Sequence, residues 1–287
     1  MRKILIAFIL FLFCELKIYG QQNIDFLPEG LNFKPLIANV YEPRLGVLYF
    51  PDDRSLKVDI GNSIDIIAYN NLIPNTKVSL GIDFMAYGLA SSYEGKRLQI
   101  DALDGFFGGN ATVSYKLSND VNYKFRFRII HNSAHLVDGS YSNDRGVWKN
   151  NYLPVPYARD FLEITSVREK SFNGGNYRAY FSPSYSVLIR PDLLKRWSFN
   201  AGTEIYFNEL LGNILEKETN TYFAYHFSLI GVPEYQGNHT FIVGMKFGSV
   251  YSKGVNFYLS YHLGMHYFSE YFSKRIDKFG IGFNVEF

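Results

Sequence analysis

Three residues near the middle of the chain have the types and the spacing of a hydrolytic site. His131, Ser133 and His135 alternate with Asn132 and Ala134. Residues two apart on an extended strand share one face and lie about 6 to 7 Å apart, so an imidazole can reach the Ser133 hydroxyl and act as its general base. The spacing predicts nucleophilic attack by Ser133, with His131 or His135 as the base.

Asp160 offers a carboxylate for the same site. If segments 122–137 and 158–168 are neighbouring antiparallel strands, Asp160 lies on the same face at a similar height. A carboxylate that orients a His beside a Ser completes the logic of a serine hydrolase triad. Two alternatives stay open: the four side chains are ordinary solvated residues in the headgroup zone, or a bulge turns them into the lumen.

A metal site is not predicted from these residues. His131 and His135 would be about 13 Å apart on an extended strand, whereas zinc–nitrogen bonds are about 2 Å long. The only cysteine, Cys14, lies in the N-terminal apolar run. We expect no metal and no other cofactor, with calcium considered only under a lipid hydrolase interpretation.

The elements that would position these residues are strands with a strict two-residue alternation. In segment 279–287, aromatic and aliphatic residues alternate with glycine and polar residues up to the final Phe287. Similar segments recur upstream, and their alternation assigns Ile189 and Tyr267 to the apolar face. An apolar outer face and a polar inner face are typical of a transmembrane β-barrel. The 26 Phe and 23 Tyr residues suit the aromatic girdles of such a barrel.

Counting these segments predicts a transmembrane antiparallel β-barrel of about twelve strands. An even count places both termini in the periplasm and the longer loops outside. The longest connection, 138–157, is then external, and 209–220 is a periplasmic connection with room for a helical turn. The apolar parity switches within 97–117, which predicts a β-bulge near Asp104 or Gly105.

The N-terminal part of the chain has the features of an export signal. A basic start, a short apolar run and the small Gly20 predict a signal peptide over residues 1–20, too short to span a bilayer comfortably. Residues 21–43 do not alternate and are interpreted as a periplasmic lead-in, a plug in the barrel mouth or a disordered tail. Residues 44–287 would form the barrel.

Charge and location limit the partners. Residues 1–20 hold three of the 29 basic residues and one of the 27 acidic residues, which leaves 26 of each and a net charge of zero. Nucleic acid is therefore not expected as a partner. The expected location is the outer membrane of a Gram-negative bacterium. The expected partners are outer-membrane lipids and the barrel-assembly machinery, which would bind the C-terminal strand ending in Phe287; the sequence predicts no oligomeric state.

The inward parity carries charges of both signs. Such charges could set the selectivity of a pore, or they could pair across a closed lumen that is filled with side chains. The predicted lumen-facing charged residues are Lys57, Asp59, Asp65, Asp83, Lys124, Arg126, Arg128, Arg159, Glu163, Arg178 and Glu204.

Three stretches resemble an uncharacterised family of outer-membrane barrels, the domain-of-unknown-function family 1207. They are FKPLIANVYEPR at 33–44, DALDG at 101–105 and HNSAHLVD at 131–138. Members of that family typically read H-x-S-x-H-L-G-D-E, whereas Val137 replaces the Gly and Gly139 the Glu in this chain. The resemblance implies an outer-membrane location and no defined activity.

The H-x-S element also resembles the one in outer-membrane phospholipase A and in lipid A deacylases, barrels whose His and Ser face lipid. That resemblance implies Ser133 as the nucleophile and His131 as the base, although Ala134 stands where those enzymes usually have Asn. The sequence is interpreted as that of an envelope barrel of undefined activity, with limited solute passage or a structural role as the default hypothesis. The alternatives are a membrane-embedded serine esterase acting on phospholipid or lipid A at the outer leaflet, and a binding or adhesion barrel using loop 138–157.

Overall fold

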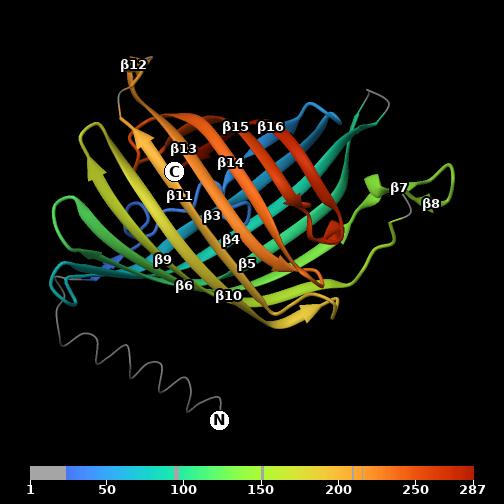
Figure 1. The fold of residues 1–287 in the computed structure, drawn as a ribbon, viewed down its shortest axis with the longest axis horizontal. Coiled ribbons are helices and arrows are strands. Elements are labelled where there is room, and N and C mark those ends of the chain that lie inside the picture. Colours follow the sequence, from blue (N-terminus) through green and yellow to red (C-terminus); the bar gives the residue numbers. More distant parts are fainter. Residues whose placement is uncertain (1–23, 94–96, 150–151, 209, 215) are drawn as a thin grey trace, which may run out of the picture.

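The protein forms one closed wall of antiparallel strands, seen in a computed structural model that describes residues 24–93, 97–149, 152–208, 210–214 and 216–287 (Figure 1). Each wall strand pairs with the next along the chain, and the last pairs with the first to close the barrel. The predicted twelve-stranded antiparallel barrel is confirmed; the predicted signal peptide, 1–20, lies outside the described residues. The wall strands are β2 (Leu45–Phe50), β3 (Ser55–Asn70), β4 (Thr76–Tyr93), β5 (Arg97–Lys116), β6 (Val121–Leu136), β9 (Tyr157–Phe172), β10 (Gly175–Arg190), β11 (Trp197–Phe207), β13 (Lys217–Gly231), β14 (Tyr235–Phe247), β15 (Gly254–Met265) and β16 (Arg275–Glu286).

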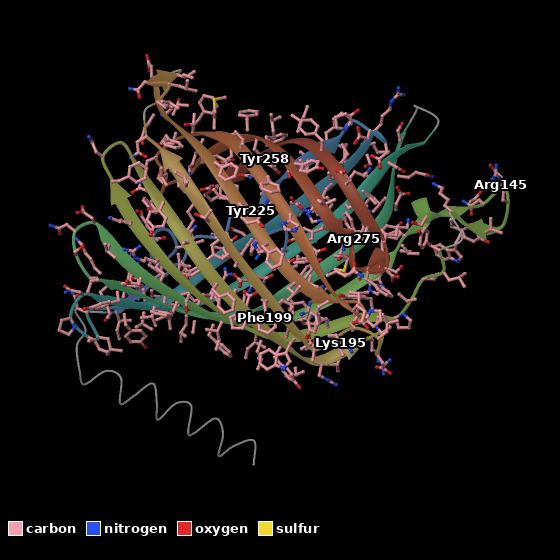
Figure 2. All side chains as sticks on the ribbon, in the orientation of Figure 1. Arg145, Lys195, Phe199, Tyr225, Tyr258 and Arg275 are labelled. Atoms are coloured by element: carbon pink, nitrogen blue, oxygen red, sulfur yellow. The ribbon has the colours of Figure 1, made fainter. Side chains whose placement is uncertain are left out.

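The remaining elements are short, and one of them, β1 (Ile24–Phe26), pairs with the end of β3. The others are the 3-10 turn η1 (Asp138–Ser140), β7 (Tyr141–Ser142), β8 (Val147–Trp148), β12 (Asn213–Ile214) and the 3-10 turn η3 (Ser269–Tyr271). β7 and β8 pair as a small projection, and Figure 2 marks Arg145 at its tip. None of the helical elements in the described ranges has the length and apolar character needed to cross a membrane.

The two ends of the barrel differ in their connections. The connection 137–156, with β7 and β8, lies at the end where β6 finishes and β9 begins, which we call the loop end. The opposite end, the turn end, has the short connections 117–120 and 173–174 and also the connection 208–216 (Figure 1). In that last connection, β12 pairs with the start of β13 as a short hairpin.

The wall follows the predicted alternation except where the register shifts. The bulge predicted near Asp104 or Gly105 occurs instead at Asp101, because Leu89 pairs with Ala102 and Ala90 with Ile100. A second irregularity, between Ser186 and Leu188, turns Ile189 into the interior. Tyr267 lies beyond the end of β15 and is also buried, so the outward assignments of these two residues are wrong.

The interior of the barrel is filled from the wall and from the N-terminal segment. Inward tyrosines lie over inward glycines of the next strand: a Cβ added at Gly202 would lie 2.3 Å from the Tyr180 hydroxyl, and one at Gly282 would lie 2.5 Å from the Tyr258 ring. Within segment 32–44, which we call the inner segment, Phe33, Leu36 and Ala38 are buried. Small barrels fill their interior with side chains in this way.

Candidate active site on the outer wall

Strands β6 and β9 bring two of the predicted site residues into direct contact. The two strands are antiparallel neighbours, and His131 is the register partner of Asp160. Residues directly opposite each other on neighbouring strands point to the same face of the sheet. His131 Nδ1 lies 2.5 Å from Asp160 Oδ1, a short hydrogen bond between an imidazole and a carboxylate.

This pair lies on the outer face of the barrel. The His131 side chain is 38% exposed and the Asp160 side chain 36% exposed. Ile129, the preceding outward residue of β6, is 52% exposed and belongs to the apolar outer surface. The pair therefore continues an apolar stripe with two polar side chains. Polar groups on a lipid-facing wall are costly and for that reason tend to be functional.

Ser133 occupies the next outward position on β6. Its backbone pairs with Gly105 on one side and with Ala158 on the other, so small residues flank its hydroxyl. His135 lies one outward position further and is exposed. Within the described residues, no hydrogen bond joins Ser133 to either histidine. Catalytic hydrogen bonds are often long before substrate binds and tighten in the complex.

Phe107 fixes a second side of the imidazole. Phe107 on β5 is the register partner of His131, and the two ring centroids lie 5.0 Å apart at an interplanar angle of 49°. His131 is therefore held between an aromatic ring on β5 and a carboxylate on β9. Because Asp160 engages Nδ1, Nε2 is the ring nitrogen that can accept a proton from Ser133.

The inner face of β6 carries a different set of contacts. Arg126 donates two hydrogen bonds to Glu42 of the inner segment, 2.8 Å from Nη1 to Oε2 and 2.5 Å from Nη2 to Oε1. Arg128 Nε lies 2.8 Å from Glu163 Oε1 on β9. These two carboxylates neutralise the two guanidinium groups inside the barrel.

A second cluster ties the inner segment to β10 and β11. Arg178 Nη1 donates to Glu204 Oε2 over 2.8 Å, and its Nη2 donates to the Lys34 carbonyl over 2.9 Å. The Ile37 amide donates to Glu204 Oε1 over 2.7 Å. The inner segment is thus held by the same charged side chains that the sequence offered as lining for a pore.

The eleven charged residues expected to face the lumen have their side chains on the inner face of the barrel. Ten of them are buried. The eleventh, Arg159, is half-buried and donates to Ser186 Oγ and Ser198 Oγ, two buried hydroxyl groups. The charges therefore meet partners within a filled interior.

Sequence reasoning missed Glu42 as the partner of Arg126. Glu42 is fully buried, but it lies in a stretch without alternation, so parity says nothing about its direction. The available signal was charge balance: β6 points Lys124, Arg126 and Arg128 inward in succession. Three buried cations on one strand require carboxylates nearby, because an unpaired buried charge is costly.

At the loop end, the connection 266–274 packs a neutral histidine into the barrel mouth. Burial lowers the pKa of His266 to about 3, and the positive charges of Lys274 and Lys278 lower it further. His266 Nδ1 accepts a hydrogen bond from the Phe268 amide over 3.1 Å, and its ring packs edge-on against Tyr271. Only a neutral imidazole can accept that bond.

Ligation of a metal ion requires several suitable side chains that lie close together. Within the described ranges, no group of three or more His, Cys, Asp or Glu side chains is arranged to hold a metal ion. His131 and Asp160 are a pair, and Ser133 is the third polar group beside them.

A closed twelve-stranded wall with an apolar outer face and a polar interior defines the class of bacterial outer-membrane β-barrels. Solved structures support this class. Outer membrane phospholipase A from Escherichia coli matches with a TM-score of 0.51 at 10% sequence identity, over 86% of this chain and 93% of that chain. An active-site mutant of the same protein matches with a TM-score of 0.53 at 10% identity, over 90% and 94% of the two chains.

The outer membrane phospholipase dimer of Salmonella typhi with bound calcium matches with a TM-score of 0.50 at 10% identity, over 89% of this chain and 94% of that chain. At such identities the likeness shows the fold alone. No protein-family model matches this sequence, and no curated protein matches it. The resemblance to the uncharacterised barrel family therefore rests on the three sequence stretches themselves.

Proposed function

We propose that this protein is an outer-membrane serine esterase that hydrolyses an acyl ester of a membrane lipid at its outer wall. The observation that carries the proposal is the His131–Asp160 hydrogen bond on the outward face of the barrel, with Ser133 at the next outward position of the same strand. Polar side chains that continue an apolar stripe on a lipid-facing wall are costly, and this cost favours a functional role for the three groups.

The chemistry uses each of the three groups once per half-reaction. Ser133 Oγ attacks the ester carbonyl while His131 Nε2 takes the hydroxyl proton, and Asp160 stabilises the imidazolium through Nδ1. The tetrahedral intermediate then expels the alcohol, which receives that proton, and leaves an acyl group on Ser133. Water attacks the acyl-enzyme with His131 again as the base, releasing the fatty acid and restoring Ser133.

The location follows from the class of the fold. We place the protein in the outer membrane of a Gram-negative bacterium, with the loop end outside and both termini in the periplasm, because such barrels have their long loops outside. The connection 137–156 is the longest at either end of the wall. In that orientation Ser133 lies near the outer leaflet, so its substrate would be an outer-leaflet phospholipid or lipid A.

Limited solute passage or a structural role in the envelope is compatible with the fold and ranks second. A pore needs an open path, whereas the inner segment occupies the interior and is held there by Arg126 and Arg178. The charged residues that would set the selectivity of a pore are buried in contact with each other. These contacts favour a function at the outer face of the barrel over solute passage through its interior.

Release of fatty acid by the refolded barrel tests the proposal. The full-length protein and the Ser133→Ala variant are reconstituted in vesicles of phosphatidylethanolamine, or of lipid A, with and without calcium. We expect release by the wild type and loss of release by Ser133→Ala, because the nucleophile is gone. Ser142→Ala, on β7 outside the wall, is the matched control. If the folded wild type releases no fatty acid from either lipid with or without calcium, the proposal is wrong.

A further inference from the structure

An apolar groove runs along the outer wall from the candidate site toward the turn end. It has a volume of about 570 Å³, and His131 and Asp160 form its polar end. Phe107, Phe127 and Ile129 line its sides, and all three are large side chains with at least 40% exposure. The volume falls within the roughly 300 to 1,000 Å³ that is common for small-ligand sites.

Small outward residues on β5 form the floor of the groove. Gly109 lies on the outward parity of β5, with Ile129 of β6 and Ile82 of β4 as its register partners. A Cβ added at Gly109 would meet no atom closer than the Gly81 carbonyl, 3.7 Å away. The next outward residue, Ala111, is also small. The wall is therefore thin along one line that begins at the His131–Asp160 pair.

We propose that this groove seats one long acyl chain of the lipid whose ester bond is presented to Ser133, and that Gly109 and Ala111 set the chain length that is accepted. The proposal rests on the proposed esterase function and names the part of the substrate that the wall recognises. A membrane lipid has its ester groups near the interface and its chains toward the midplane. The groove has the same polarity: His131 and Asp160 lie at its loop end, and the outward side chains further along are apolar, whereas Asn110 turns inward and donates to Asp83.

The direction of the groove favours a lipid chain over a second copy of the barrel. The floor of the groove is one line of small residues, Gly109 and Ala111, beside the large outward side chains of β6, and such a line suits an unbranched chain. The chain would also pass beside the Phe107 ring that packs on His131. Occupation of the groove and orientation of the general base are therefore linked through one side chain.

Chain-length selectivity tests this proposal. Gly109→Phe and Ala111→Phe fill the groove, and Ala201→Phe places the same ring on the outward face of β11, between Phe181 and Phe227. With butyryl and palmitoyl esters of one alcohol, we expect the two groove variants to lose at least about tenfold of their palmitoyl activity relative to butyryl activity. Ala201→Phe should keep the wild-type ratio. An unchanged ratio in both groove variants overturns the proposal.

A labelling experiment separates failure of this proposal from failure of the esterase function. Ser133→Ala is reconstituted with a phosphatidylethanolamine that carries a diazirine at the end of one acyl chain, then irradiated and digested. We expect labelled peptides containing residues 107–111 and 125–129, and loss of that label in Gly109→Phe. Labelling without hydrolysis by the wild type would remove the esterase and keep the groove. Hydrolysis without labelling there, or crosslinks between two barrels at this face, would remove the acyl-chain assignment.

Discussion

The two faces of β6 carry similar chemical groups and use them in opposite ways. On the inner face, Arg126 and Arg128 are almost fully buried and are paired with Glu42 and Glu163. On the outer face, His131 is more than one-third exposed and has one carboxylate partner. The inner contacts neutralise buried charges, which folding requires. The outer contact engages only Nδ1 of His131 and leaves Nε2 available. Polar groups that stability does not need are the better candidates for function.

The comparison also predicts how much stability the protein loses when a polar group is removed from either face. A buried ion pair that loses one partner leaves an uncompensated charge, which destabilises the fold strongly. A half-exposed pair is solvated already, so its loss costs little stability. Variants of the outer face should therefore change activity at nearly constant stability, and variants of the inner face should do the reverse.

The largest effect is expected from His131→Ala. Loss of the general base of a hydrolytic triad lowers kcat by up to about 10⁶-fold, and the midpoint of thermal unfolding should stay close to the wild-type value. Fatty acid release and heat-induced change in gel mobility measure the two quantities on one preparation. His135→Ala is the matched control and should retain most of the activity. If His135→Ala is the inactive variant and His131→Ala is not, His135 is the base.

Asp160→Ala should have the second largest effect on activity. Without the carboxylate, Nδ1 of His131 has no acceptor and the imidazolium is less stabilised, so we expect a loss of up to about 10⁴-fold in kcat. Asp160→Asn keeps an oxygen acceptor and should retain more activity than Asp160→Ala. Equal activity of Asp160→Ala and the wild type would show that the hydrogen bond to His131 has no catalytic use.

Glu42→Ala should reverse the pattern. Removal of the carboxylate leaves Arg126 buried without its bidentate partner, and we expect a loss of about 3 kcal/mol in the free energy of unfolding. Activity below the unfolding midpoint should stay within about twofold of the wild type, as expected for a residue on the other side of the wall. Urea titration in detergent micelles and fatty acid release measure the two effects. Glu42→Gln, which can still accept from Arg126, should be less destabilising.

The same variant tests the filled interior. In a planar bilayer, the wild type should show little conductance, because the inner segment occupies the barrel. Glu42→Ala should raise the frequency of open events, because one of the contacts that hold this segment is lost. Steady conductance of the wild type that changes with Arg126→Ala would favour the solute-passage function instead.

The smallest expected effect is a pH dependence at the loop end. The pKa of His266 is about 3, below the ordinary 6.5, so the unfolded chain takes up a proton first as the pH falls. The stabilising contribution of the neutral ring is therefore complete above about pH 6.5 and declines from there toward pH 3. At pH 5.5 we expect a loss of about 1 kcal/mol. Faster exchange of the Phe268 amide should report it, and His266→Asn should abolish the change between pH 7 and pH 5.5.

Much of the wall could be predicted because a membrane imposes one rule on every strand. Alternation placed His131 and Asp160 on one face at one height, and the register pairs them directly. Alternation fails where the backbone departs from the regular ladder. The bulge at Asp101 and the irregularity before Leu188 each depend on local backbone geometry, so the position of the first and the burial of Ile189 were not predictable.

The position of the inner segment could not be predicted from alternation at all. Residues 32–44 follow no period, and their positions depend on contacts with distant side chains such as Arg126 and Arg178. Only the excess of inward cations on β6 pointed to a missing acid. The Ser133 hydroxyl remains the least predictable part of the site, because small shifts of a side chain decide whether it meets His131.

The connection 137–156 separates the two halves of the His131–Asp160 pair by 29 positions in the chain. Before β6 and β9 pair, the imidazole and the carboxylate are not held together, so under the proposed function an unfolded chain would be inactive. Lipolytic competence would then appear only on completion of this part of the wall, inside the target membrane. Such a hydrolase would spare the inner-membrane lipids that it passes on its way.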